Sequence, residues 1–291
     1  MGVRRDVLYA REYFLAVEGL AILRNVVTRP SAIRDRVGEV REIVAGFDEF
    51  PNSLEIPVIE HEIEDGYTAW ASRYDKPGNP AIIGEEPVVH ELLAGLSMPA
   101  GVALDAACGT GRHAAKLAEL GHRVIGVDTT DAMLDVARTK VPAGDFRRGR
   151  LEDLPLDDAS VDLITCGLAL THASDLGPVM REFARVLRPG GHAVLSDIHP
   201  VASDAGAVAA FPDGDLSKGI PYVHNFPHPI STYITAFVAA GLSIAACIEP
   251  TYTDELVTYN AAYSVFPEAA RQAFLGLPFL LVWHLHRPSA P

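Results

Sequence analysis

Two acidic residues that each end an apolar run frame the part of this sequence best suited to bind a ligand. The first run ends in Asp105 and is followed by the turn Gly109, Thr110 and Gly111; the second run ends in Asp128. Glycines let a backbone approach a ligand closely, and the N-terminus of a following helix offers free N–H groups to an anion. A carboxylate at the tip of the second strand is well placed to hold ribose hydroxyls. These residues predict a site for a nucleoside-bearing cofactor.

The turn by itself leaves two kinds of cofactor open. Gly109, Gly111 and Ala114 satisfy the dinucleotide pattern G-x-G-x-x-G/A, so the motif does not exclude NAD. Asp105 favours a cofactor with a cationic amino group, which NAD lacks. A nicotinamide-dependent oxidoreductase would also need hydride-transfer residues such as a Tyr-x-x-x-Lys pair, and the sequence contains no such pair.

With three downstream segments, this loop resembles the class I S-adenosylmethionine-dependent methyltransferases. Residues 105–111 are similar to the family loop D-x-G-x-G-x-G, with Ala107 in place of the first glycine. Residues 127–134 resemble the family segment VDxSxxML, residues 151–156 resemble AEDLPF, and residues 182–191 are typical of a helix closed by a Pro-Gly-Gly turn. The resemblance is strong over about residues 100–200 and weaker over residues 60–100 and 229–290. It implies S-adenosylmethionine as the cofactor and leaves the methyl acceptor open.

The resemblance also implies which residues surround the cofactor. Asp105 is expected to hold the amino group, directly or through water, and Asp128 the ribose hydroxyls. The other expected contacts are Gly109, Thr110 and Gly111 in the loop, Thr129 and Met133 beside the adenine, Leu151 and Glu152 at its edge, and Gly167 at the methionyl part. Tyr67 and Tyr74 are expected to cover the methionyl end or the sulfonium, because aromatic faces attract cations. Core packing is the alternative for both tyrosines and for Met133.

Two histidines follow strands at the carboxyl edge of the predicted sheet. His172 comes after the fourth strand and His199 after the fifth. A histidine can take a proton near neutral pH, so both are predicted as general bases for the acceptor. The alternatives are a structural role for His172 and a local cap formed by Asp197 and His199.

The alternation of apolar runs predicts an α/β fold with a doubly wound, mostly parallel, seven-stranded Rossmann-like sheet. Strands are expected near 102–106, 123–127, 144–148, 161–166, 191–197, 242–249 and 279–286, and helices near 111–120, 130–139, 175–187 and 231–241. Residues 1–60 are predicted as a helical extension and 61–291 as the methyltransferase domain, with lid insertions at about 200–228 and 251–277. Within the extension, residues 4–46 are expected to be helical, with Ser31 capping a second helix, and residues 48–60 to form a connector. Residues 61–76 are expected to form one amphipathic helix.

The composition of the chain limits the classes of molecule that we expect it to bind. The chain has 291 residues and a formal net charge of −14, which disfavours nucleic acid. It shows no secretory signal pattern, no apolar run long enough for a membrane and no tight cluster of metal ligands, and its three cysteines are widely spaced. We therefore expect a cytoplasmic enzyme without a metal, and the N-terminal helices are candidates for a homodimer interface. It would methylate oxygen or nitrogen of a small specialised metabolite; a carbon acceptor such as a quinone, an oxidoreductase and a non-methylating binder of the cofactor are alternatives.

Overall fold

The computed structural model describes residues 4–215 and 218–289 and divides into two compact units. Unit 1 contains the residues up to Glu62, Val208–Val223 and Thr251–Leu277. Unit 2 contains Ile63–Ala207, His224–Pro250 and the residues from Pro278 onward. The predicted boundaries of an extension and a methyltransferase domain, and the role of the insertions as lids, remain predictions.

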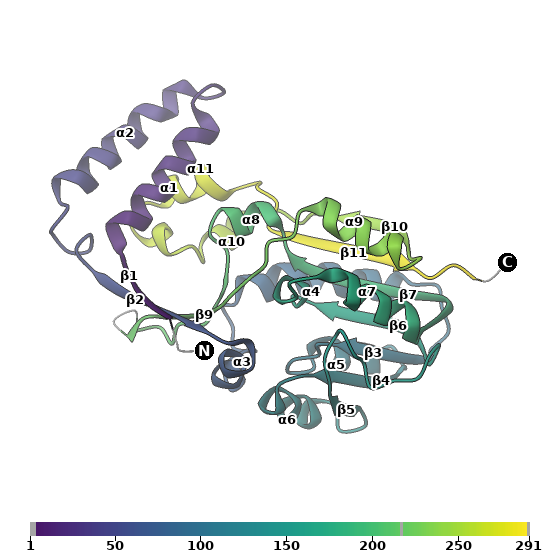
Figure 1. Ribbon diagram of the computed structural model, residues 1–291. Helices are drawn as coiled ribbons and strands as arrows, with labels where there is room; N and C mark the ends of the chain where they lie inside the picture. The colour runs from purple at the N-terminus through teal and green to yellow at the C-terminus, as the bar shows by residue number, and fades with distance from the viewer. Residues whose placement is uncertain (1–3, 216–217, 290–291) are drawn as a thin grey trace. The chain divides into compact units, whose positions relative to one another are not determined.

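Unit 2 is built on a seven-stranded sheet in the order β10-β11-β7-β6-β3-β4-β5 (Figure 1). The strands are β3 (Val102–Ala106), β4 (Arg123–Asp128), β5 (Asp145–Arg148), β6 (Val161–Gly167), β7 (Leu187–Ile198), β10 (Ser243–Ile248) and β11 (Leu280–His286). β11 pairs antiparallel with both β7 and β10, and the other neighbouring pairs are parallel. The predicted mostly parallel seven-stranded sheet is confirmed.

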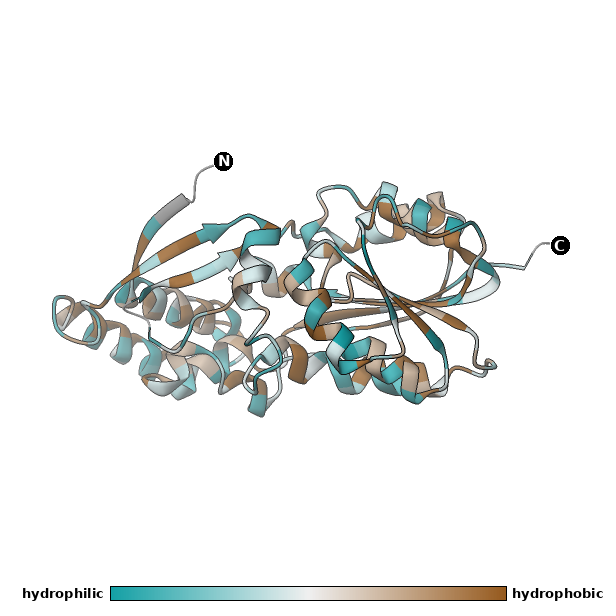
Figure 2. Ribbon diagram, turned by 90° about the horizontal axis from the view of Figure 1, so that it is seen from below, coloured by the Kyte–Doolittle hydropathy of each residue, from teal (hydrophilic) through white to brown (hydrophobic). Residues whose placement is uncertain are grey.

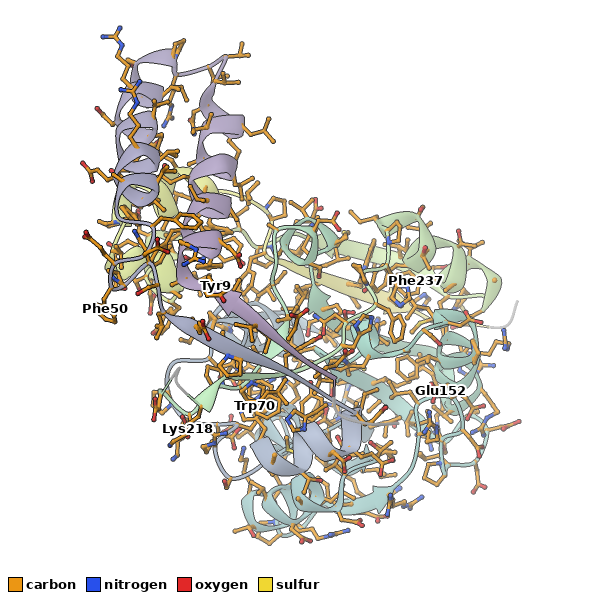
Figure 3. All side chains as sticks on the ribbon, turned by 60° about the vertical axis from the view of Figure 1, so that its left-hand side comes forward. Tyr9, Phe50, Trp70, Glu152, Lys218 and Phe237 are labelled. Atoms are coloured by element: carbon orange, nitrogen blue, oxygen red, sulfur yellow. The ribbon has the colours of Figure 1, made fainter. Side chains whose placement is uncertain are left out.

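Helices cover both faces of this sheet, because each face is apolar. The helices are α4 (Pro80–Gly95), α5 (Arg112–Glu119) and α6 (Asp131–Lys140), and then α7 (Leu176–Val186) and α9 (Ile230–Ala239). Val89, Leu117 and Leu134 of the first three helices share one hydrophobic core with the sheet, whereas Phe183 and Phe237 of the last two share another. Figure 2 shows the mainly hydrophobic strands between the helices, and Figure 3 labels Phe237 on α9.

The strand order reverses between β3 and β6, and this reversal fixes where a ligand can bind. From β3 the chain continues to β4 and β5 on one side, whereas β6 and β7 lie on the other. In open α/β sheets, ligands bind outside the carboxyl ends of the strands at such a point. The loops that follow β3, β4, β6 and β7 therefore bring the functional residues together.

Unit 1 has its own four-stranded sheet in the order β1-β2-β9-β8, which the sequence did not predict. Its strands are β1 (Arg4–Tyr9), β2 (Glu55–His61), β8 (Ala209–Ala210) and β9 (Ile220–Val223). The expected helix over residues 4–9 is wrong, because these residues pair antiparallel with β2 along their full length. The connector predicted at residues 48–60 likewise contains most of β2.

The helices of unit 1 are α1 (Ala10–Asn25), α2 (Pro30–Ala45), the short α10 (Asp254–Val257) and α11 (Pro267–Phe274), with a 3-10 helix, η3 (Ala261–Ser264). Ser31 does not cap α2: the helix begins with Pro30 after the N-cap residue Arg29. Proline suits the first turn because its missing N–H would be unpaired there anyway.

Three further expectations differ from the structure. Residues 61–76 form a shorter helix, α3 (Ile63–Trp70), followed by turns. Helix α4 was not expected. The stretch 200–228 was expected to be a long irregular insertion, yet it contains α8 (Pro200–Asp204) as well as β8 and β9. None of the helices within residues 4–215 and 218–289 is long and apolar enough to cross a membrane.

Candidate active site

The loop after β3 carries three residues in the left-handed backbone region. Ala107, Gly109 and Gly111 have φ angles of 53°, 52° and 79°. A Cβ added at Gly109 would meet no atom within 4 Å, so open space borders this residue. A Cβ added at Gly111 would lie 3.0 Å from the Cβ of Ala137, so α5 and α6 approach too closely there for a side chain. The loop therefore presents bare backbone beside open space at Gly109.

Asp128, at the end of β4, is hydrogen-bonded to this loop. Its Oδ2 accepts the N–H of Gly109 and its Oδ1 accepts the N–H of Thr130, both at 2.8 Å. Burial raises the pKa of the Asp128 carboxyl, and the two backbone donors oppose that rise. A carboxylate has about four lone-pair sites, so both oxygens retain capacity for further donors. The carboxylate thus has the chemistry and the position to hold ribose hydroxyls.

Asp105, at the end of β3, uses both of its oxygens inside the protein. Oδ2 accepts the N–H of Ala114 at 2.8 Å, and Oδ1 accepts the hydroxyl of Thr165 at 2.9 Å. The side chain is fully buried, and burial raises the pKa of Asp105 to about 6. Ala114 lies in the first turn of α5, whose N-cap residue Gly111 has no side chain to accept that N–H. Asp105 therefore caps α5, a role that the sequence analysis did not assign to it.

A buried carboxylate from α4 fixes the other side of α5. Glu85 is fully buried; its Oε1 lies 2.7 Å from Nε2 of His113 and accepts the Ser196 hydroxyl at 2.6 Å, while its Oε2 accepts Arg112 at 3.0 Å. Burial alone would raise the pKa of Glu85, but the charges of His113 and Arg112 outweigh it and hold the pKa below its usual value. A Cβ at Gly167 would lie 2.5 Å from His113 Nε2, so the missing side chain makes room for this network. We call Glu85, Arg112, His113 and Ser196 the Glu85 network.

The sequence analysis missed the Glu85 network, although it contains a usable signal. Glu85 lies within the otherwise largely apolar stretch Pro80–Gly95. Carboxylates are almost never fully buried unless they are paired, so an acid in such a stretch indicates a buried partner.

Aromatic residues of α3 and the following turn form a cluster near the loop. The ring centroids of Tyr67 and Trp70 are 5.8 Å apart, and those of Trp70 and Tyr74 are 4.8 Å apart; Figure 3 labels Trp70 on α3. Tyr74 packs with Met133, which is 1% exposed. The guanidinium of Arg112 lies 5.9 Å from the centroid of the Tyr74 ring. The geometry favours the core interpretation for Met133 and leaves the predicted cofactor contacts of both tyrosines as predictions.

Tyr67 is joined directly to one of the two predicted bases. Its hydroxyl lies 2.7 Å from Nε2 of His172, and Nδ1 of His172 lies 3.0 Å from the carbonyl oxygen of His224. Burial lowers the pKa of His172, so the imidazole is neutral near pH 7. His172 is therefore held in the 3-10 turn that follows β6, in a form that can accept a proton.

His199 lies in a different environment. Its Nδ1 accepts the N–H of Val201 at 3.1 Å and caps α8, so its Nε2 carries the proton and lies 2.9 Å from Glu249. Both ring nitrogens are engaged, and the side chain is 3% exposed. This geometry favours the capping interpretation of His199 over the predicted role as a base. Asp197 takes no part in that cap: its Oδ2 accepts the Tyr233 hydroxyl at 2.6 Å.

The remaining predicted residues are distributed around the loop. The Thr110 hydroxyl donates to Asp75 at 2.6 Å. Thr129 borders a cavity of about 220 Å³ at the ends of β4 and β5. Leu151 packs against the main core, whereas Glu152, labelled in Figure 3, is exposed with Oε2 3.5 Å from Nε of Arg150. Their roles toward a cofactor remain predictions.

Comparison with known proteins gives this geometry a family context. Residues 104–195 match the family described as "Methyltransferase domain". The malonyl-[acyl-carrier protein] O-methyltransferase of Yersinia pestis is 45% identical over 97 residues, which are 33% of this chain and 36% of that protein. The biotin biosynthesis bifunctional protein BioHC of Cellvibrio japonicus is 33% identical over 210 residues, covering 65% of this chain and 40% of that protein. The chain thus spans well under half of the length of these two relatives.

A solved structure supports the fold. The S-adenosylmethionine-dependent methyltransferase from Mesorhizobium loti superposes with a TM-score of 0.51 at 24% identity, covering 70% of this chain and 98% of that one. At this level of identity the likeness concerns the fold, which is the one described above.

Proposed function

We propose, from the premise that this chain carries a class I S-adenosylmethionine-dependent methyltransferase domain, that the whole protein transfers the methyl group of S-adenosylmethionine to a small molecule. The match over residues 104–195, the strand order and the names of the relatives support this proposal. The nicotinamide-dependent oxidoreductase considered from the sequence lacks such support.

The observation that carries the proposal is the hydrogen-bonded pair of loops at the ends of β3 and β4. Bare backbone at Gly109 borders open space, and the Asp128 carboxylate beside it would hold the two ribose hydroxyls. Thr129 borders the neighbouring cavity, which would take the adenine. When bound, S-adenosylmethionine supplies a methyl group already activated by a positively charged sulfur. The aromatic faces of Tyr67 and Tyr74 suit the neighbourhood of that charge.

The acceptor proposed here is oxygen or nitrogen of a small specialised metabolite. Because the methyl group is already activated, holding the two reactants in line supplies much of the rate, about 7–11 kcal/mol in favourable cases. The net charge of −14 supports a small molecule over a nucleic acid. Dimer formation through α1 and α2 and a cytoplasmic location remain predictions.

Asp128→Ala tests this assignment of the cofactor site. Removing the carboxylate deletes the acceptor of two ribose hydroxyls, so we expect the affinity for S-adenosylhomocysteine to fall at least about 100-fold. Titration calorimetry measures the affinity, and circular dichroism checks that the fold is retained. Asp131→Ala is the matched control, because Asp131 is an exposed acid three residues further on that pairs with Arg148. Equal affinities of the Asp128→Ala variant and the wild type would contradict the assignment.

A further inference from the structure

The hydrogen bonds of His172 fix its tautomer and the direction of its bond to Tyr67. A carbonyl oxygen only accepts, so Nδ1, 3.0 Å from the His224 oxygen, carries the proton. Nε2 therefore has the free lone pair, and the Tyr67 hydroxyl, 2.7 Å away, donates to it. Burial raises the pKa of Tyr67 well above its usual value and lowers that of His172. The Tyr67 oxygen is left with lone pairs that can accept a hydrogen bond from another molecule.

The segment that directly follows β9 in the chain is hydrogen-bonded to the turn that carries His172. We call residues 224–228 the strap. The Phe226 N–H donates to the Thr171 carbonyl at 2.6 Å, and Nε2 of His228 donates to the Ala173 carbonyl at 2.7 Å. With the bond from His172 to the His224 carbonyl, three hydrogen bonds hold the strap against residues 171–173. Asn225 is thereby held next to His172.

The side chain of Asn225 is buried without a partner. It is 7% exposed, and neither Oδ1 nor Nδ2 has a hydrogen-bond partner among residues 4–215 and 218–289. Leaving a buried polar group unpaired destabilises the folded state. Such a group in a folded protein calls for an explanation, and recognition of another molecule is one. The amide of Asn225 therefore has one acceptor and two donors available to another molecule.

The charges around Tyr67 disfavour an anionic ligand. Asp128 and Asp197 both act on Tyr67 to raise its pKa, as does the neighbouring Tyr74. Arg112 acts in the opposite direction, but its guanidinium is paired with Glu85 at 3.0 Å and with Glu86 at 2.9 Å. His224 is the titratable group that faces His172 from the strap. A carboxylate acceptor would be repelled by the charge of Asp128, and Arg112 is already paired with two carboxylates.

We propose that the methyl acceptor is a neutral hydroxyl group, of a phenol or an alcohol, bound between Tyr67 and Asn225, and that its proton passes through Tyr67 to His172. The inference rests on the proposed methyl transfer and names its substrate class. A hydroxyl donates to the Tyr67 oxygen while it accepts from the Asn225 amide. A carboxylate has no proton to donate, and an ammonium group has no lone pair to accept. A neutral amine has a single lone pair, and the bond to the methyl carbon requires it, whereas a hydroxyl oxygen has two. The hydroxyl is thus the acceptor group that satisfies both side chains.

The step balances in atoms and electrons. A lone pair of the acceptor oxygen forms the bond to the methyl carbon, and the carbon–sulfur bond breaks with its electron pair left on the sulfur. The acceptor's proton moves to the Tyr67 oxygen as the proton of Tyr67 moves to Nε2 of His172. The products are a methyl ether, a neutral thioether and an imidazolium. The imidazolium keeps its Nδ1–H bond to the His224 carbonyl.

A panel of acceptors tests the substrate class. The purified full chain is incubated with S-adenosylmethionine carrying a tritiated methyl group and with phenols, alcohols, amines and carboxylic acids on matched aromatic and aliphatic frames. We expect label only on hydroxyl groups. Label on amines or carboxylates instead would overturn the inference while methyl transfer itself stands. No label on any member, with S-adenosylhomocysteine still bound, would overturn both proposals.

Variants test the proposed path of the proton through Tyr67 to His172. They are assayed with the hydroxyl compound that the panel identifies as the best acceptor. Tyr67→Phe keeps the ring and removes the relay, so we expect kcat to fall about 10²–10⁴-fold with the affinity for S-adenosylhomocysteine unchanged. Because burial lowers the pKa of His172, the wild-type kcat should fall only at a pH below the usual histidine pKa, where His172 becomes charged, and Tyr67→Phe should lose this limb of the profile. Tyr259→Phe is the matched control, because the exposed Tyr259 belongs to unit 1. An unchanged pH profile in Tyr67→Phe would refute the relay.

Asn225→Ala separates orientation of the acceptor from proton transfer. We expect KM for the hydroxyl acceptor to rise about 10-fold or more, because the amide donor is lost, while the pH limb due to His172 remains. Unchanged KM would remove Asn225 from the acceptor site.

Discussion

Ala107 has a backbone conformation that residues with a side chain disfavour. Its φ of 53° lies in the left-handed region, which disfavours residues with a Cβ. The sequence already showed alanine where the resembling family has glycine. The structure adds that this substitution carries a conformational cost at the start of the cofactor loop.

Ala107→Gly is expected to stabilise the protein. Removing the left-handed strain stabilises the folded state by about 1–2 kcal/mol. The greater conformational freedom of glycine stabilises the unfolded chain by about 0.4–1 kcal/mol, which offsets part of that gain. The free energy of unfolding, measured by urea titration, should therefore rise by about 0.5–1 kcal/mol. Ala159→Gly should give a similar gain, since Ala159 has a φ of 47° outside the loop. Ala132→Gly, within α6, should instead destabilise by about 0.5–1 kcal/mol. A loss of stability in Ala107→Gly would contradict this account of the loop.

Asp197 links stability to pH. Burial raises the pKa of this carboxyl to about 7, against the hydrogen bonds from Tyr233 and from the N–H groups of Ile198 and Thr171. The folded state thus holds the proton more tightly than the unfolded state, in which aspartates titrate near about pH 4. The contribution of Asp197 to stability is therefore greatest below about pH 4 and is lost as the pH rises through 7.

Asp197→Asn should remove that part of the pH dependence. Between pH 5 and pH 8, the variant should gain about 2–3 kcal/mol in free energy of unfolding relative to the wild type. Urea titrations of both proteins at the two pH values measure the difference between them. A constant difference would show that the pKa of Asp197 is not raised.

At the residue scale, the sequence predicted groups whose neighbours are close along the chain. Gly109 follows β3 and Asp128 ends β4, and their hydrogen bond agrees with the proximity expected of them. Asn225 and Glu85 escaped notice because their significance depends on burial and on partners far along the chain. The pairing of Tyr67 with His172 joins residues from two elements and could not be read from either segment alone.

Helix α4 positions the site although it contributes no residue to the predicted cofactor contacts. Glu85 ties it to α5 through Arg112 and His113 and to β7 through Ser196. These bonds hold the N-terminal turn of α5, which directly follows the glycine loop. The geometry of the loop therefore depends on an element that precedes it in the chain.

Glu85→Ala is expected to cost about 3–5 kcal/mol, because it leaves buried charged and polar partners without their carboxylate. Glu86→Ala is the matched control. Glu86 pairs with the same Arg112 at 2.9 Å, but its side chain is 35% exposed, so its loss should cost less than about 1 kcal/mol. Urea titration compares the two variants. Equal losses would contradict the structural role of the Glu85 network.

A strand could be predicted from the sequence where its local residue pattern and its pairing with other strands favour the same conformation. The strands β3, β4 and β6 are apolar runs separated by helices, and they pair with one another in the predicted sheet. In contrast, β1 pairs with β2 about fifty residues later, and β2 pairs with β9 further along still. The periodicity of residues 4–9 fits a helix equally well, so only the distant partner decides their conformation.

At the scale of the whole molecule, the chain divides into two compact units, and neither of them is one continuous stretch of sequence. Unit 1 is assembled from three separate stretches of sequence, and its small sheet joins strands from two of them. Such an arrangement leaves no continuous signal for a sequence pattern to detect. The sheet of unit 2 is encoded by sequence motifs that follow one another along the chain, and it is the part of the structure that the sequence predicted well.

The most direct test of the account is calorimetric titration of the whole protein with S-adenosylhomocysteine and, in parallel, with NAD. The bare backbone at Gly109 and the carboxylate of Asp128 are assigned to a nucleoside with a methionyl tail. We predict micromolar binding of S-adenosylhomocysteine, about −8 kcal/mol, and no binding of NAD. Binding of NAD without S-adenosylhomocysteine would contradict the central claim that this fold serves methyl transfer.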